Sequence, residues 1–250
     1  MNGAKLLLAC LAVGAGLAEP ATAQAAAEVA SEAAPQAGRL SSALEVALLL
    51  TVLSLLPAAL VSVTSFTRIV IVLSFVRRSL STNELPPNPV VIGLALFLTS
   101  FVMGPVIQRM HASAYVPYES GQIQATEAMS MAWGELSQFL LDNTRESELE
   151  LFVELSSRSG REVSIEDRPF TVLVPAFVLS ELKTAFQMGF LLFLPFLVID
   201  LVVSSILLSM GMFMLPPVTI STPFKILLFV LVDGWSLVCQ SVVSSFVVAT

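Results

Sequence analysis

Four long runs of apolar residues alternate with shorter polar segments along the chain. They cover residues 46–76, 90–107, 186–210 and 224–248. A helix needs about 20 consecutive apolar residues to cross the hydrocarbon core of a membrane, so each run is a candidate spanning helix. Prolines follow the first and the third run, which predicts a turn after each. The pattern therefore predicts two hydrophobic helical hairpins, residues 44–111 and 171–250.

The first apolar run is too long for a simple membrane helix. Its 31 residues would extend about 46 Å as a helix, whereas the hydrocarbon core is about 30 Å thick. Pro57 is expected to kink the run, and Arg68 lies inside it. A charged residue at membrane depth is costly, so we expect this helix to pack against protein along much of its length. Arg77 and Arg78 follow it, before the proline turn at residues 86–89.

Residues 181–217 organise the second hairpin. Lys183 precedes the apolar run, Asp200 lies inside it, and three methionines stand at alternate positions at its end. These methionines are Met210, Met212 and Met214. Gly211 and the two prolines that follow predict a turn here, and in an extended loop the three side chains would share one face. Methionine is common in membrane helices and also suits a compliant constriction, and the spacing leaves both interpretations open.

An acidic segment separates the two hairpins. Residues 112–170 carry eleven acidic residues against four arginines. Two amphipathic stripes at helical spacing run through the segment. The first is Met129, Trp133, Leu136 and Leu140, and the second is Leu149, Phe152 and Val153. We expect a small helical domain outside the membrane, followed by a short apolar lead-in at residues 170–179 that Pro175 interrupts.

The N-terminus has the pattern of a cleaved secretory signal. Lys5 provides the positive charge, residues 6–17 the apolar core, and residues 21–23 the small-residue cleavage site, so residues 1–23 are expected to be a signal peptide. Residues 7–10 also resemble a lipoprotein box ending at Cys10, which we favour less because almost no apolar segment precedes it. Residues 24–43 show no apolar period and are expected to form a flexible tail.

The composition agrees with a membrane protein. Hydrophobic residues make up 56% of the chain, charged residues only 12%, and the mean hydropathy is +0.86. Soluble domains carry about 25% charged residues. The expected fold class is an all-α polytopic membrane protein with four hydrophobic helices. A cleaved signal would place the acidic segment and the C-terminus in the periplasm, and Arg77 and Arg78 in the cytoplasm, as the positive-inside rule favours.

Catalytic and cofactor motifs are not evident in the sequence. The chain has one histidine, His111, and two cysteines, Cys10 and Cys239, so the usual metal-ligand spacings cannot be built. It has no phosphate-binding glycine loop and no basic stripe of the kind that binds nucleic acid. We therefore expect no enzyme activity, no cofactor, no metal and no nucleic-acid partner.

The charges inside the apolar runs are the stronger signal. Arg68 lies 18 residues before the first proline turn, Asp200 lies 16 before the second, and Asp233 lies 16 after it. Their similar depth predicts a buried charge cluster, with Lys183 and Lys225 as charges at helix ends. The alternative is an ion or proton path through a small transporter. The cluster is favoured because no further polar groups continue such a path, and a partner subunit could offset the surplus acid.

Long stretches of the chain resemble the FliP/SctR family of type III export-gate subunits. The matching motifs are TSFTRIVIVLS (64–74), PPNPVVIGLALFLTSFVMGPV (86–106), ELKTAFQMGFLLFLPFLVIDLVVSSILLSMGM (181–212) and PPVTISTPFKILLFVLVDGW (216–235). The signal peptide and the length resemble the flagellar branch of the family. The resemblance implies a core subunit of the flagellar export gate in the bacterial inner membrane. It would form a homo-oligomer with FliQ-like and FliR-like subunits, beside other membrane proteins of the export apparatus, and pass unfolded substrates.

The resemblance also implies a role for the methionine segment. In the family a methionine-rich loop forms a gasket around the pore, which implies that role for Met210, Met212, Phe213 and Met214. The chain departs from the family pattern in two places: Phe213 replaces the central methionine, and Pro89 replaces a commonly polar residue. The alternative function is a small ion or solute transporter that uses Arg68, Asp200 and Asp233, although the two hairpins do not match each other as transporter repeats often do.

Overall fold

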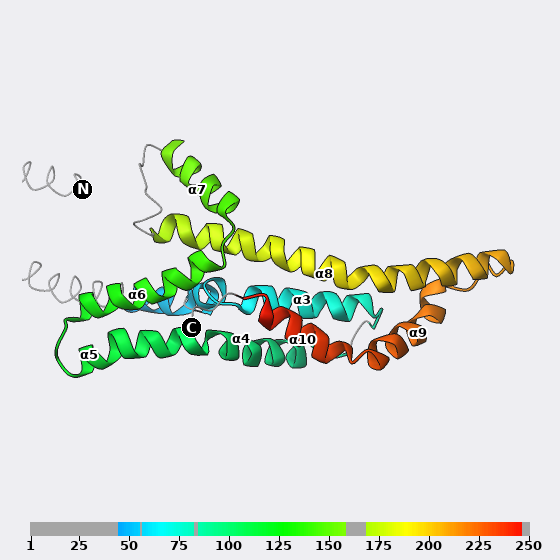
Figure 1. Cartoon of the computed structure of the whole chain (residues 1–250), viewed down its shortest axis with the longest axis horizontal. Helices are drawn as coiled ribbons and strands as arrows, with labels where there is room; N and C mark the ends of the chain where they lie inside the picture. The colour runs from blue at the N-terminus through cyan, green and yellow to red at the C-terminus, as the bar shows by residue number, and fades with distance from the viewer. Residues whose placement is uncertain (1–44, 56, 83–84, 159–168, 247–250) are drawn as a thin grey trace, which may run out of the picture. The chain divides into compact units, whose positions relative to one another are not determined.

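The computed structural model describes residues 45–55, 57–82, 85–158 and 169–246 (Figure 1). They fall into two units, residues 1–57 and 58–250. In the first unit, residues 45–55 are helical and their side chains are exposed. The predicted signal peptide and tail lie outside the described residues. Every regular element in the described ranges is a helix, which confirms the all-α fold class.

The first apolar run is not one helix. Helical residues 57–62 end in a turn at residues 63–65, and α3 (Phe66–Ser79) begins after it. The Thr67 hydroxyl donates to the carbonyl of Val61 at 3.1 Å, and the N–H of Phe66 donates to the Thr64 hydroxyl. Threonine side chains that bond nearby backbone groups compete with helical hydrogen bonds. The run is therefore broken at the TSFT motif, in addition to the kink predicted at Pro57.

The second apolar run extends much further than its hydropathy predicts. Helix α4 (Asn88–Met110) passes into a π-helical segment, η1 (His111–Tyr115), and then into α5 (Val116–Glu119). These three form a continuous apolar span of 32 residues. The start of the predicted acidic domain is thus the end of a spanning helix.

The two amphipathic stripes correspond to helices. They are α6 (Ala125–Asp142) and α7 (Glu146–Arg158). Leu140 and Leu149 are buried as the stripes predict, whereas Met129 is 72% exposed. Met129 instead lines an open groove between α6 and the end of the α4–η1–α5 helix, with Tyr115 and Tyr118.

Helix α8 (Phe170–Ser209) joins the predicted lead-in to the third apolar run. Its 40 residues continue through Pro175 and Pro195. A proline inside a helix loses one backbone hydrogen bond and tends to kink it. Around Pro175 this cost is offset by packing, since Val172, Leu173, Ala176 and Phe177 are all buried.

The fourth apolar run is broken near its middle. It forms α9 (Pro217–Leu231) and α10 (Gly234–Ser244), which are bent by 65°. Asp233, between them, has a left-handed backbone with φ of 51°. At Gly234 an added Cβ would lie 2.2 Å from the ring of Phe229, and that ring also packs edge-on against Trp235 at 5.3 Å. The aromatic pair therefore requires glycine at the bend.

The core of the second unit lies between helices far apart in sequence. Helix α8 runs along α3, with α4 and α10 on the other side of α3 (Figure 1). Ile69, Val72 and Val76 of α3 and Ala185 of α8 are at most 1% exposed. Within the described ranges, three helices are long and apolar enough to span a membrane, and the bent α9–α10 pair makes a fourth if it is one span. This agrees with a polytopic membrane protein.

Candidate functional site

The α8–α9 hairpin ends in an exposed tip that projects beyond the end of α3 (Figure 1). Helix α8 stops at Met210 because Gly211 adopts a φ of +75°. The N–H of Met212 donates to the carbonyl of Leu207 at 3.0 Å, and that of Gly211 donates to Leu208 at 3.1 Å. This pair of bonds is the Schellman motif, which ends a helix and favours glycine at this position.

The second side of the tip is set by two prolines. Pro216 precedes α9 and Pro217 is its first residue, a position where the missing proline N–H costs nothing. The residues between the two helices form turns at 210–211 and 213–214, so the tip is not a uniformly extended loop. The turn predicted from Gly211 and the prolines is present.

The tip carries large, uncharged and exposed side chains. The exposed fractions are 65% for Met210, 42% for Met212, 76% for Phe213 and 96% for Met214. All four predicted gasket residues therefore lie together on this tip. An apolar groove lies behind them, between the last turns of α8 and the first turns of α9. Its lining consists of Val198, Ile199, Val202, Val203, Ile206, Leu207, Ile220 and Phe224.

A buried ion pair braces the base of this hairpin. The Lys225 Nζ on α9 lies 2.6 Å from Asp200 Oδ2 on α8, and the lysine side chain is only 1% exposed. The same Nζ donates to Ser81 Oγ at 2.8 Å, just past the end of α3. The Ser221 hydroxyl donates to Asp200 Oδ1 at 2.5 Å. One lysine thus ties α8, α9 and the turn after α3 together.

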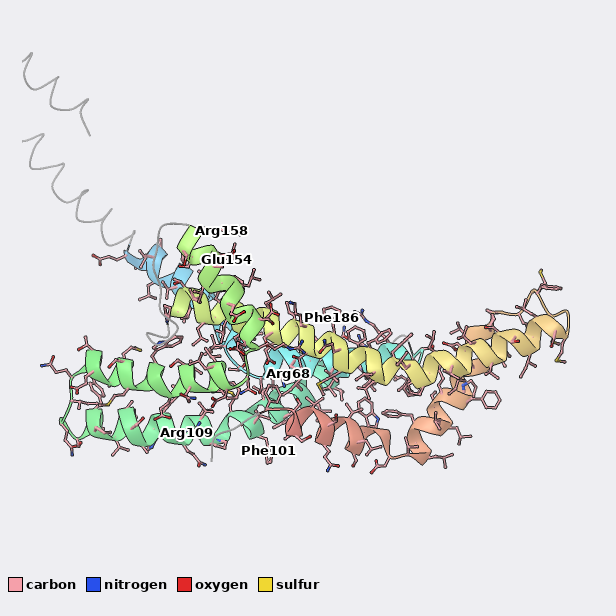
Figure 2. The ribbon with its side chains drawn as sticks, turned by 45° about the horizontal axis from the view of Figure 1, so that its top comes forward. Arg68, Phe101, Arg109, Glu154, Arg158 and Phe186 are labelled. Atoms are coloured by element: carbon pink, nitrogen blue, oxygen red, sulfur yellow. The ribbon has the colours of Figure 1, made fainter. Side chains whose placement is uncertain are left out.

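A second buried ion pair lies at the other end of α3. The Arg68 Nε donates to Glu181 Oε2 at 2.8 Å, and its Nη2 bonds the other carboxylate oxygen. The Arg68 Nη1 donates to the backbone carbonyl and the hydroxyl of Ser245, both at 2.9 Å, and its guanidinium lies 3.9 Å from the centre of the Phe246 ring. Arg68 therefore joins α3, α8 and the end of α10 (Figure 2).

The structure does not bring Arg68, Asp200 and Asp233 together. Arg68 and Ser81, the latter bonded to Lys225, are separated by about 20 Å of helix. The single predicted cluster is therefore replaced by two separate ion pairs, and a transporter path through the three charges has no support. Sequence reasoning missed Glu181 as a partner because it lies outside the apolar run that begins at residue 186, although the residue is fully buried.

Lys183 and Lys225 are not at helix ends. Both lie inside their helices, and each bonds a carboxylate. The Lys183 Nζ on α8 donates to Glu148 Oε1 on α7 at 2.6 Å. This hydrogen bond lowers the pKa of the Glu148 carboxyl below its ordinary value of 4.5. Lys183 thus fastens α7 to α8.

No group of three or more histidine, cysteine or acidic residues among the described residues is arranged to hold a metal ion. The described part of the chain instead combines paired charges with a compliant apolar tip. Such an arrangement can support and close a passage, which requires no covalent chemistry.

Comparison with known proteins identifies relatives that cover most of the chain. Residues 49–242 match the model of the FliP family. The flagellar biosynthetic protein FliP of Bacillus subtilis (strain 168) is 53% identical over 206 residues, which are 82% of this chain and 93% of that protein. The protein of the same name from Pectobacterium carotovorum subsp. carotovorum is 52% identical over 202 residues, 81% of this chain and 78% of that protein. The protein of the same name from Caulobacter vibrioides is 51% identical over 198 residues, which are 79% of this chain and 74% of that protein.

Proposed function

The chain belongs to the FliP family of flagellar biosynthetic proteins, and on that premise we propose that it is a core subunit of the flagellar type III protein-export gate. Several copies assemble with FliQ-like and FliR-like subunits in the bacterial inner membrane, beside other proteins of the export apparatus. The assembly passes unfolded flagellar substrates. The observation that carries this proposal is the exposed tip of Met210, Met212, Phe213 and Met214 on the α8–α9 hairpin.

The tip has the properties that a seal around a moving polypeptide needs. A passing chain presents side chains of different widths, while ions must stay out. The thioether of methionine is flexible and apolar, so it can fill irregular gaps and yield to a passing group. Phe213 adds a large rigid apolar surface with fewer rotatable bonds, which makes this seal stiffer than three successive methionines would be.

A compliant seal also needs a fixed base. The Schellman bonds at Gly211 hold the backbone where the tip begins. The Lys225–Asp200 pair holds α8 and α9 at a constant separation beneath it. The side chains can thus move while the backbone that presents them stays in place.

The topology follows from the predicted signal peptide and the loop charges. The chain is a multi-pass protein of the basal body, with residues 112–170 and the C-terminus in the periplasm and the methionine tip toward the cytoplasm. Arg77 and Arg78 lie on the same side as the tip, in agreement with the positive-inside rule.

The test is to replace Met210, Met212 and Met214 together with alanine. The closed gate should become wider, so cells that express this variant with the partner subunits should show salt-dependent growth inhibition and a higher single-channel conductance. Export should persist or fall only modestly. A matched control replaces Met129 and Met131, which are exposed on α6, and should remain tight to ions. Normal ion tightness in the triple variant together with lost export would show that the tip serves packing instead of sealing.

A further inference from the structure

The second hairpin contains five charged residues, and all but one of them are neutralised inside the chain. Glu181 pairs with Arg68, Lys183 pairs with Glu148, and Asp200 pairs with Lys225. The fifth is Asp233, whose carboxylate has no hydrogen bond or ion pair with any residue that the structure describes, although its backbone N–H and carbonyl bond Val230 and Leu237. The pairing of the other four shows that charges in this hairpin are matched wherever a partner is within reach.

Asp233 is exposed in the single chain, but its backbone position is unusual. It lies at the 65° break between α9 and α10, in a left-handed backbone. Its side chain makes no hydrogen bond to the first turn of α10, so helix capping does not account for it. Its neighbours Leu231 and Val232 are exposed apolar residues. A carboxylate in an apolar span is costly unless it meets an opposite charge or water.

One cation shows the same lack of a partner. Eight lysines and arginines lie in the described ranges, and the side chains of seven of them have a hydrogen bond or ion pair there. The eighth is Arg78, exposed in the last turn of α3. Its neighbour Arg77 bonds the Asn88 side chain, so the two arginines differ although they are adjacent.

The unpaired cation and the unpaired anion belong to the same end of the second unit. An apolar groove joins the turn after α3 to the α9–α10 break, with Leu80, Leu85 and Pro86 on one side and Phe229 and Trp235 on the other. Arg78 and Asp233 nevertheless make no ion pair with each other among the described contacts. Each copy of the chain therefore presents one free charge of each sign at this level.

We propose that Asp233 of one copy forms an ion pair with Arg78 of the adjacent copy. This proposal rests on the proposed function, in which several copies assemble. A contact between two different patches repeats head to tail, so each copy uses its acid on one neighbour and its arginine on the other. Both charges are then satisfied throughout a ring or helix except at its ends. The adjacent copy then covers the exposed apolar residues Leu231 and Val232 beside Asp233, which removes water and strengthens the pair.

Crosslinking between differently tagged copies tests the contact. Both endogenous cysteines are first replaced with serine, Cys10→Ser and Cys239→Ser, in the full chain expressed with its partner subunits. One copy then carries Arg78→Cys and the other Asp233→Cys, and membranes are treated with a short bismaleimide. The expected product is a dimer that carries both tags and is absent when either variant is expressed alone. Glu127→Cys, at an exposed position of α6, replaces Arg78→Cys in the matched control and should give no such dimer.

Charge variants provide a second measurement on the same assembly. Asp233→Asn keeps a residue that tolerates a left-handed backbone and removes only the charge. It should lower the yield of assembled complex on a native gel by roughly tenfold, the scale expected for an ion pair lost away from bulk water. Asp233→Lys should also lose assembly, and adding Arg78→Glu to it should restore part of the yield. Glu127→Lys, a charge reversal at an exposed acid of α6, should leave assembly unchanged.

The outcomes separate this inference from the proposed function. If the complex assembles but no mixed dimer forms and Asp233→Asn assembles normally, the contact is refuted while the export-gate proposal stands. If a single chain carrying both cysteines becomes crosslinked within itself and mixed copies do not, the pair is internal and the contact is refuted. If the unmodified chain forms no complex larger than a monomer, both proposals fail.

Discussion

At Lys225, a side chain in the middle of α9 places its ammonium between a carboxylate on α8 and a hydroxyl after α3. The ammonium is almost completely removed from solvent, whereas Asp200 keeps about a quarter of its side-chain exposure. Removing the lysine alone would leave the largely buried Asp200 carboxylate without a partner. Removing the lysine and the carboxylate charge together would leave no unpaired charge. The fold depends on the match between the two charges more than on either one.

Lys225→Met should therefore lower the free energy of unfolding of the purified chain by about 3 kcal/mol, the scale of a broken buried pair. The double variant Lys225→Met with Asp200→Asn should recover part of that loss. Arg158→Met is the matched control, because Arg158 pairs with Glu154 at the exposed end of α7 (Figure 2) and should cost at most about 1 kcal/mol. Denaturant titration in detergent measures all three. Equal losses for Lys225→Met and the double variant would show that the two charges do not stabilise each other.

Gly211 and Gly234 both lie next to helix ends, but glycine is required at the two positions for different structural reasons. Gly234 is required by the ring of Phe229, whereas Gly211 has no atom near its missing Cβ and is required only by its backbone angle. An L-residue in this left-handed region costs about 1–2 kcal/mol, and asparagine costs less than alanine.

Gly211→Ala should lower the stability of the α8–α9 tip by about 1 kcal/mol. The loss in Gly211→Asn should be smaller, because asparagine adopts the left-handed conformation more readily than alanine. The same substitution at Gly93 is a control, because Gly93 lies inside α4 with open space around it and alanine favours a helix. Hydrogen exchange of residues 207–217 measures the local opening. Unchanged exchange in Gly211→Ala would mean that the Schellman turn does not fix the tip.

The attachment of α7 to α8 depends on pH through Glu148. Its folded pKa is lowered by the hydrogen bond from Lys183, so the bond contributes stability above the ordinary pKa of 4.5 and is lost as the pH falls through the lower folded value. With Phe152→Trp as a fluorescent reporter on α7, the acid transition should have its midpoint below pH 4.5. Adding Lys183→Met should move that midpoint upward. A midpoint that does not move would show that other groups control the transition.

Local sequence signals predicted the helices and one turn well. The apolar runs identified the spanning segments, and Gly211 with the two prolines identified the tip. Two interruptions of helices, at residues 63–65 and between α9 and α10, were missed because hydropathy does not report their causes. Threonine hydroxyls bond the backbone near residue 64, and the Phe229 ring leaves room only for glycine at position 234. Sequence spacing also paired the wrong charges, because Arg68 meets Glu181 across 113 residues of chain.

At the scale of the second unit, the charges divide into two groups. The buried ones, Arg68, Glu181 and Lys225, are matched in pairs, whereas all the acids of α7 except Glu148 remain in solvent. Glu146, Glu150 and Glu154 are all exposed on this helix, and only Glu154 has an ion-pair partner there, Arg158. An exposed acidic helix fastened to α8 by Lys183 and Arg145 is placed to contact other molecules, away from the tip that we propose closes the passage.

We therefore expect the α7 acids to act in docking. Changing Glu146, Glu150 and Glu154 together to glutamine should reduce the amount of assembled complex or its solubility more than it reduces export per assembled complex, because the tip residues that we propose close the passage are unaffected. Native gels and quantified secretion of flagellar substrate measure the two quantities in the same cells. Glu119→Gln with Glu127→Gln is the control, since both acids are exposed in the same acidic segment but lie outside α7. Normal assembly with abolished export in the α7 variant would assign these acids to transport itself.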